Sequence, residues 1–128
     1  MIIAFWTLPL TLIFLWLSFR VIRHRRSALI PLGAGGDARL ERAIRAHANF
    51  AEYVPFAVLL LVLAEWGGAW PWLLHALGAL LVAARLSHGM GIAQEPEDYR
   101  FRVFGMTGTF SVLGIAALAA FWGALMRG

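Results

Sequence analysis

The stretch IIAFWTLPLTLIFLWLSF, residues 2–19, contains no charged side chain. An apolar run of about 20 residues is what an α-helix needs to cross the hydrocarbon core of a bilayer. The first charge after this run is Arg20, whereas a cleaved signal peptide has its charge before the apolar run. We therefore expect a first membrane span over residues 2–22 that is retained.

The rest of the chain has the same apolar character. Of its 128 residues, 61% are hydrophobic and only 14% are charged, and the mean hydropathy is +0.74. So little charge is too little for the surface of a soluble domain, and the apolar runs are too long for strands. We predict an all-α integral membrane protein, with a four-helix transmembrane bundle as its single domain over residues 1–128. The expected spans are 2–22, 38–66, 70–91 and 99–126.

Arginine placement predicts how the bundle is oriented. Residues 20–45 contain seven arginines against two carboxylates, whereas the turn between the second and third spans has no basic residue. Basic loops stay on the cytoplasmic side. We therefore expect loops 1–2 and 3–4 to be cytoplasmic and both termini to lie outside.

Composition also excludes some classes of function. The chain has no cysteine, so disulfides and thiolate metal sites are excluded, and we expect no metal. A pI near 11.1 would suit a nucleic-acid-binding protein. The arginines flank apolar spans, however, and no aromatic-basic surface motif is present, so we expect no nucleic-acid partner.

Charged and polar side chains interrupt the spans at a few positions. The second span has four of them on one helical face, at spacings i, i+3, i+7 and i+10: Arg42, Arg45, Asn49 and Glu52. Arg85 and His88 lie in the third span, and Arg102 begins the fourth. Because charges rarely face lipid, we expect these groups to point into the bundle or into a subunit interface.

The residues alone leave two interpretations of this polar face open. It could be a structural ion network, in which Arg45 and Glu52 fix the packing of the helices. It could instead bind a ligand, because the arginines outnumber Glu52 and Glu41, the carboxylates that we expect to face them. A ligand with carboxylates and one amine would use the arginines and Glu52 together.

One segment of the second span resembles a known family. ERAIRAHANFAEYVPF, residues 41–56, resembles the signature of the MAPEG family, membrane-associated proteins in eicosanoid and glutathione metabolism. The pattern E-R-x-x-R-x-x-x-N-x-x-E-x-x-P is complete. ARLSHGMG (residues 84–91) and RFRVFGM (residues 100–106) are similar to the family's third and fourth helices, and the chain most resembles its short bacterial members.

The resemblance implies a homotrimer of four-helix subunits in a bacterial inner membrane, with glutathione as co-substrate between adjacent subunits on the cytoplasmic side. It implies a glutathione transferase or peroxidase that is surrounded by membrane lipids. Its second substrate would be a lipophilic small molecule that enters the site from the bilayer. Arg102 would be the catalytic residue that activates the thiol, and Glu52 would pair with the γ-glutamyl amine. The residues implied to bind glutathione are Arg45, Asn49, Glu52, Tyr53, Arg85 and His88. Glu41 and Arg42 would have structural or secondary roles.

Two departures from the family pattern keep other hypotheses open. Eukaryotic glutathione-conjugating relatives have tyrosines where this chain has His88 and Ile92, and the loop AQEPEDYR is longer here. An alternative is therefore a non-catalytic MAPEG-type protein that binds lipid or a partner protein. A small multidrug transporter also has four short spans, but it needs a carboxylate deep in its first helix, and residues 2–19 contain none.

Overall fold

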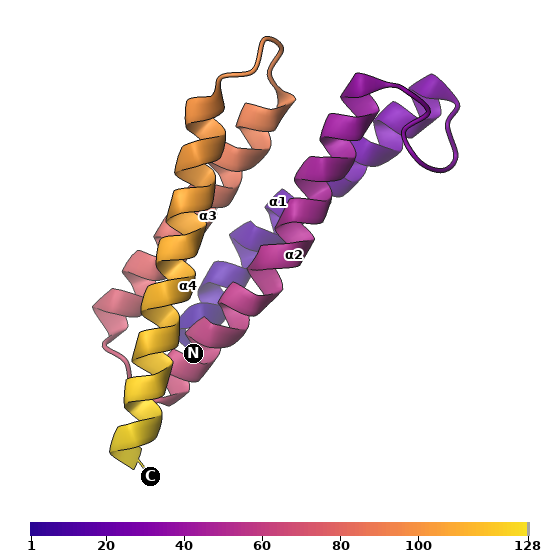
Figure 1. The fold of residues 1–128 in the computed structure, drawn as a ribbon. Coiled ribbons are helices and arrows are strands. Elements are labelled where there is room, and N and C mark those ends of the chain that lie inside the picture. Colours follow the sequence, from indigo (N-terminus) through magenta and orange to yellow (C-terminus); the bar gives the residue numbers. More distant parts are fainter. Residues whose placement is uncertain (128) are drawn as a thin grey trace.

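The computed structural model describes residues 1–127, which form four α-helices joined by short loops (Figure 1). Their bounds are α1 (Ile2–Ala28), α2 (Ala38–Trp66), α3 (Pro71–Ala93) and α4 (Tyr99–Arg127). Each helix is long and apolar enough to cross a membrane. The predicted all-α fold with four spanning helices is confirmed, while assembly into a homotrimer stays a prediction.

The helix ends follow from local chemistry. Asp37 caps α2 because its carboxylate accepts a hydrogen bond from the Leu40 amide at 2.9 Å. Pro71 opens α3, where a missing amide hydrogen costs nothing. The helix α1 runs to Ala28, beyond the expected end of its membrane span, so its arginine-rich final turns extend past the apolar run.

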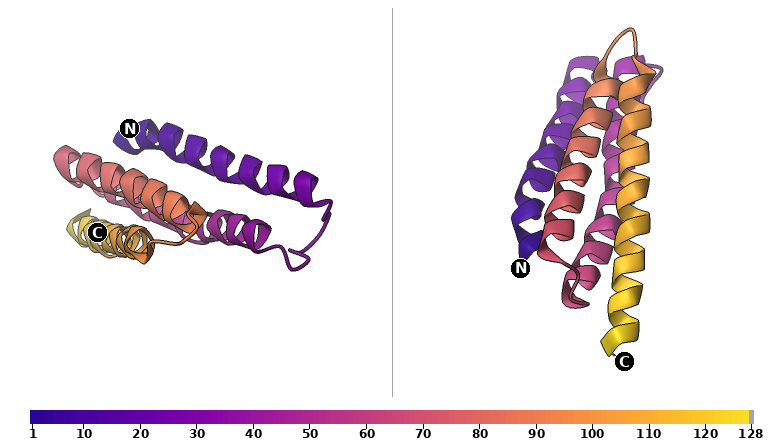
Figure 2. Two further views of the ribbon diagram at one scale, coloured as in Figure 1. Left: turned by 90° about the horizontal axis from the view of Figure 1, so that it is seen from above. Right: turned by 90° about the vertical axis from the view of Figure 1, so that its left-hand side faces the viewer.

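The bundle is closed at one end and splayed at the other. Figure 1 shows both termini and the turn between α2 and α3 at one end, while α1 and α2 diverge from α3 and α4 toward the two remaining loops. At the closed end, Glu65 of α2 accepts hydrogen bonds from the backbone amides of Ile2 and Ile3. These amides are unpaired within α1, so Glu65 caps one helix from another. The views in Figure 2 show the four helices running along one another.

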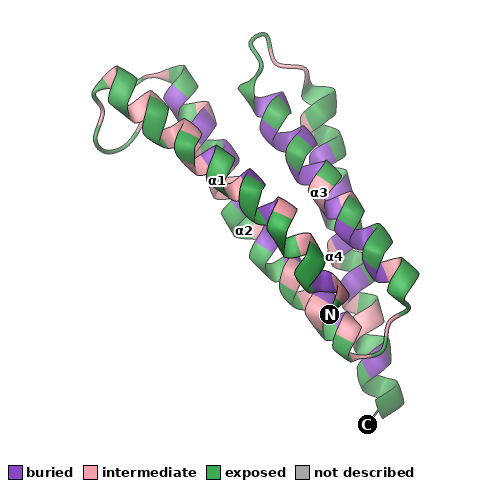
Figure 3. Cartoon of the chain, turned by 180° about the vertical axis from the view of Figure 1, so that it is seen from behind, coloured by how far each residue is buried: buried purple, intermediate pink, exposed green. Residues whose placement is uncertain are grey.

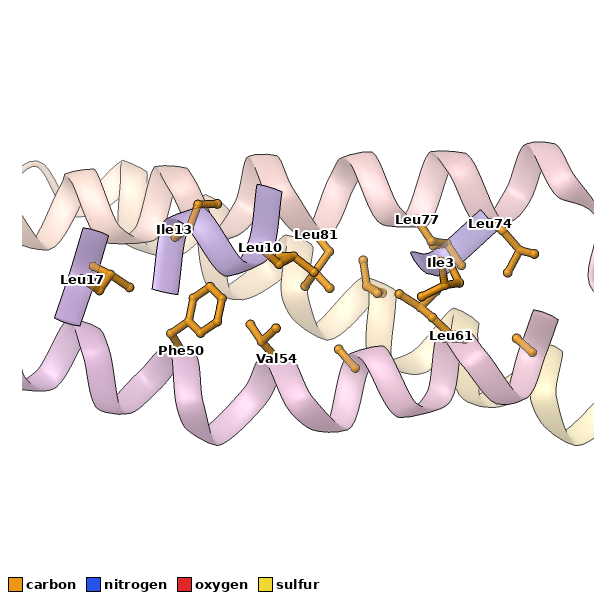
Figure 4. Close-up of a cluster of buried hydrophobic side chains, with 14 of the residues drawn as sticks. Ile3, Leu10, Ile13, Leu17, Phe50, Val54, Leu61, Leu74, Leu77 and Leu81 are labelled. Carbon is orange, nitrogen blue, oxygen red and sulfur yellow. The ribbon is translucent and has the colours of Figure 1, made fainter. Parts of the chain in front are cut away.

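An apolar core fills the space between the helices. Leu10 and Leu17 of α1 meet Phe50 and Val54 of α2, and leucines of α3 complete the cluster (Figure 4). The outward surface is also apolar, with Phe5, for example, two-thirds exposed, and Figure 3 shows exposed residues along every helix. A surface of this kind suits lipid as the surrounding solvent.

Glycines allow α4 to approach its neighbours closely. A methyl group added at Gly123 would lie 2.6 Å from the Cα of Gly67, the residue that follows α2, and one added at Gly105 would lie 2.6 Å from the His88 Cβ in α3. Burial of apolar surface does not drive helices together in lipid, so membrane helices associate through close packing, which small residues at the crossing allow. This packing positions α4 against the polar residues of α2 and α3.

Candidate functional site

Arg85 is a buried cation held by neutral groups. Its side chain, on α3, is 1% exposed. One guanidinium nitrogen donates to the Asn49 Oδ1 at 2.6 Å and another to the Thr109 Oγ1 at 3.3 Å. The Thr109 hydroxyl itself donates to the Gly105 carbonyl at 2.7 Å, which leaves its oxygen free to accept from Arg85.

The surroundings of Arg85 offer it no charge compensation in the described chain. Its Nε has no hydrogen-bond partner within residues 1–127, and the guanidinium carbon lies 5.9 Å from the centre of the Phe50 ring. A buried guanidinium without a carboxylate is costly, even when neutral oxygens and an aromatic face offset part of the cost. The position therefore favours the approach of an anion.

Arg45 and Glu52 lie on the outer side of α2. Their closest charged atoms are 3.9 Å apart, and their side chains are 58% and 53% exposed in the protomer. The core side of α2 is formed by Ala46, Phe50 and other buried residues, and the exposed side chains of Arg45 and Glu52 point away from the bundle. Asn49, on the same helical face, instead reaches the buried Arg85. Of the two orientations predicted from the sequence, the interior of the protomer is wrong for this pair, and a subunit interface stays a prediction.

Glu97, in the loop between α3 and α4, joins two arginines. Its Oε1 accepts from Arg102 at 2.8 Å and its Oε2 from Arg42 at 2.9 Å, and its side chain is only 7% exposed. Burial alone would raise the pKa of Glu97, but the hydrogen bonds from Arg102 and Arg42 outweigh it and hold this pKa below the usual glutamate value. Glu97 is therefore a charged link between α2 and the start of α4.

The carboxylates that pair with the arginines differ in part from those that the sequence predicts. The sequence predicts Glu52 and Glu41 as the partners of the arginines, but Glu41 is exposed and forms no ion pair within residues 1–127. Glu97 takes that place, and Glu95 lies 3.8 Å from both Arg39 and Arg42. Sequence reasoning missed Glu97 because it stands in a polar loop, although its position five residues before Arg102 permits contact.

The remaining candidate residues are Tyr53 on α2 and His88 on α3. The Tyr53 ring packs edge-on against Phe110 of α4 with 5.6 Å between ring centres. His88 is 3% exposed, and its Nδ1 has no hydrogen-bond partner in the part of the chain that is described. The protomer thus pairs Asn49 with Arg85, whereas Arg102 hydrogen-bonds with Glu97.

The fold and this polar region define an integral membrane protein of four apolar helices with a buried cation at its core. The MAPEG family model matches residues 3–122, and the chain belongs to this family. It is 35% identical over 122 residues to the inner membrane protein YecN of Escherichia coli strain K12. The matched segment is 95% of this chain and 92% of YecN. The YecN protein of E. coli O6:H1 strain CFT073 matches to the same extent. These similarities and the four apolar helices support an integral inner membrane protein.

Proposed function

We propose that this protein is a glutathione-dependent membrane enzyme of the MAPEG type, a transferase or peroxidase that acts on lipophilic electrophiles. One observation supports this proposal most. The half-exposed Arg45–Glu52 pair lies on the same helical face as Asn49, the acceptor of the buried Arg85. Charged side chains rarely face lipid, so a second protomer with a polar ligand between the two would account for their exposure.

Glutathione has the charges that this face lacks. Its two carboxylates suit the guanidinium groups of Arg45 and Arg85, because arginine binds carboxylates through paired hydrogen bonds. Its amine suits Glu52. Asn49 and Tyr53 would add neutral hydrogen bonds, as would the buried Nδ1 of His88, which has no hydrogen-bond partner within residues 1–127. The site would be complete in a homotrimer, where a neighbouring protomer covers the outer side of α2.

Arg102 would act on the thiol. A guanidinium beside the sulfur stabilises the thiolate, and the thiol proton passes to solvent. The thiolate then attacks the electrophilic carbon of the second substrate, a carbon–sulfur bond forms, and the leaving group departs with its electron pair. With a lipid hydroperoxide, two glutathione molecules are oxidised to the disulfide while the hydroperoxide is reduced to an alcohol and water.

The test is conjugation of glutathione to 1-chloro-2,4-dinitrobenzene by the purified protein in detergent. We expect Arg102→Ala to reduce the rate about a hundredfold, because removing one group that stabilises negative charge in an active site typically costs about 10²–10³-fold in rate. Arg100→Ala is the matched control, since Arg100 is 91% exposed, is paired with Asp98 and lies two residues away on α4. Equal rates for the two variants would show that Arg102 does not activate the thiol.

A second candidate function is a non-catalytic MAPEG-type protein that binds lipid or a partner. The pairing of Arg102 with Glu97 favours it, because a guanidinium already neutralised at 2.8 Å has less field to offer a thiol. Calorimetry separates the two candidates. Absence of glutathione binding at millimolar concentration would reject the enzyme and leave the non-catalytic protein.

A further inference from the structure

A basic cavity opens between α1, α2 and α3 at the splayed end of the bundle. Its volume is about 230 Å³. Figure 1 shows α1 and α2 diverging from α3 at this end. The cavity is lined by the last turn of α3 and by Arg20, His24, Arg39, Arg42 and Glu95.

Positive charge exceeds negative charge around this cavity. Glu95 is its one carboxylate among the described residues, and it lies 3.8 Å from both Arg39 and Arg42. Arg42 is also bound to Glu97, which it shares with Arg102. Two loop carboxylates therefore serve Arg39, Arg42 and Arg102, and neither of them forms an ion pair with Arg20 among the described residues.

Arg20 is the least compensated of these arginines. Within residues 1–127 its guanidinium donates a hydrogen bond to a backbone oxygen, the Gly89 carbonyl, at 3.3 Å, and its guanidinium carbon lies 5.3 Å from the centre of the Trp16 ring. Neither partner neutralises the charge. Arg20 is also the first charge after the apolar run 2–19, which places the cavity at the level where the membrane core gives way to headgroups.

We propose that this cavity binds the phosphate of an anionic phospholipid. Basic pockets between membrane helices suit lipid headgroups, and each arginine near the surface strengthens attraction to an anionic lipid. The apolar side chains beside the cavity favour a lipid over a free anion. Trp16 and Phe19 are 37% and 60% exposed next to Arg20, so acyl chains would contact them while the phosphate meets the guanidinium. The proposal does not depend on glutathione, because Arg20, His24 and Arg39 have no part in that site and only Arg42 borders both.

Native mass spectrometry of the delipidated protein in detergent tests the proposal. The probes are dioleoylphosphatidylglycerol and dioleoylphosphatidylcholine, which share acyl chains and differ in net charge. We expect the anionic lipid to bind the wild type several-fold more tightly than the zwitterionic lipid. Arg20→Gln and Arg39→Gln should each weaken binding of the anionic lipid about fivefold. Arg23→Gln is the matched control, because it removes the same charge from an exposed position on α1.

Three outcomes would overturn the proposal. The first is equal binding of the anionic and zwitterionic lipids. The second is binding of the anionic lipid by both cavity variants as tight as by Arg23→Gln. Circular dichroism checks that each variant folds. The Arg39 side chain is 75% exposed, so Arg39→Gln should fold even if Arg20→Gln does not. The third is displacement of the anionic lipid by millimolar inorganic phosphate, which would identify the occupant as a free anion.

Discussion

Replacing Glu97 by glutamine should weaken the fold more than any other single change to a loop carboxylate. The carboxylate accepts two charge-assisted hydrogen bonds, at 2.8 Å from Arg102 and 2.9 Å from Arg42, and is 7% exposed. Glutamine keeps the volume, but its amide can accept through one oxygen only and turns a donor toward the other arginine. Hydrogen bonds to charged groups contribute about 1.5–3 kcal/mol each.

Exposure of the two arginines reduces this contribution. The side chains of Arg42 and Arg102 are 33% and 41% exposed, so water screens them and accepts part of the lost hydrogen bonding. We therefore expect Glu97→Gln to lower the free energy of unfolding by about 1–3 kcal/mol. The assay is reversible unfolding by sodium dodecyl sulfate in mixed micelles, followed by helical circular dichroism at neutral pH.

Glu95→Gln is the matched control. Glu95 stands in the same loop and is 45% exposed, with both of its arginine partners 3.8 Å away. Exposed pairs of this kind contribute less than about 1 kcal/mol, so this variant should stay close to the wild type. Equal losses from Glu97→Gln and Glu95→Gln would refute the reasoning that burial and short hydrogen bonds make Glu97 the stronger link.

The difference in stability between the wild type and Glu97→Gln should depend on pH. The folded protein holds the pKa of Glu97 below the ordinary glutamate value, so the unfolded chain binds this proton first as the pH falls. The stabilising contribution is complete above about pH 4.3, the ordinary pKa, and is lost as the pH drops through the lower folded pKa. The difference in stability between wild type and Glu97→Gln should therefore shrink below about pH 4. A difference that stays constant into acid would contradict ionisation of Glu97 as its source.

Two further variants test the packing around the candidate site. Asn49→Leu removes the oxygen that accepts from the buried Arg85 at 2.6 Å. It should lower the free energy of unfolding by about 2–4 kcal/mol in the same micelle assay, because the buried guanidinium loses a partner. An unchanged free energy of unfolding would show that Asn49 does not stabilise Arg85. Gly123→Ala places a methyl group 2.6 Å from the Gly67 Cα and should cost about 1–3 kcal/mol. Gly114→Ala on the same helix meets nothing within 4 Å and should cost nothing, so equal losses from both alanines would reject close helix approach as the cause.

The membrane helices were predictable because lipid leaves the chain few choices. Backbone polar groups in hydrocarbon must pair within the segment, so a long uncharged run such as residues 2–19 has to be a helix. The expected start of the second span at residue 38 likewise has a local cause, because the Asp37 carboxylate caps α2 through its hydrogen bond from the Leu40 amide. Both features depend on local sequence.

The contacts of the candidate site depend on tertiary structure and were only partly predictable. Helical spacing correctly placed Arg45 and Glu52 on one face, but only packing of Ala46 and Phe50 against the core decides where that face points. The pairing of Glu97 with Arg42 joins residues 55 apart in the chain through an irregular loop, and no sequence period encodes it.

The distribution of unneutralised charge separates the two proposals physically. Loop carboxylates satisfy Arg42 and Arg102, whereas Arg20 and Arg85 have only neutral partners among residues 1–127. Arg85 is hydrogen-bonded to α2 and α4 inside the bundle, and Arg20 lines a cavity on the side of α1. Two uncompensated cations on different elements favour two anions of different origin. Arg20→Gln, with its weaker lipid binding, should therefore keep glutathione turnover at the level of Arg23→Gln, and Arg102→Ala should still bind anionic lipid. If either variant abolished both activities, a single anion site would have to serve the whole splayed end of the bundle.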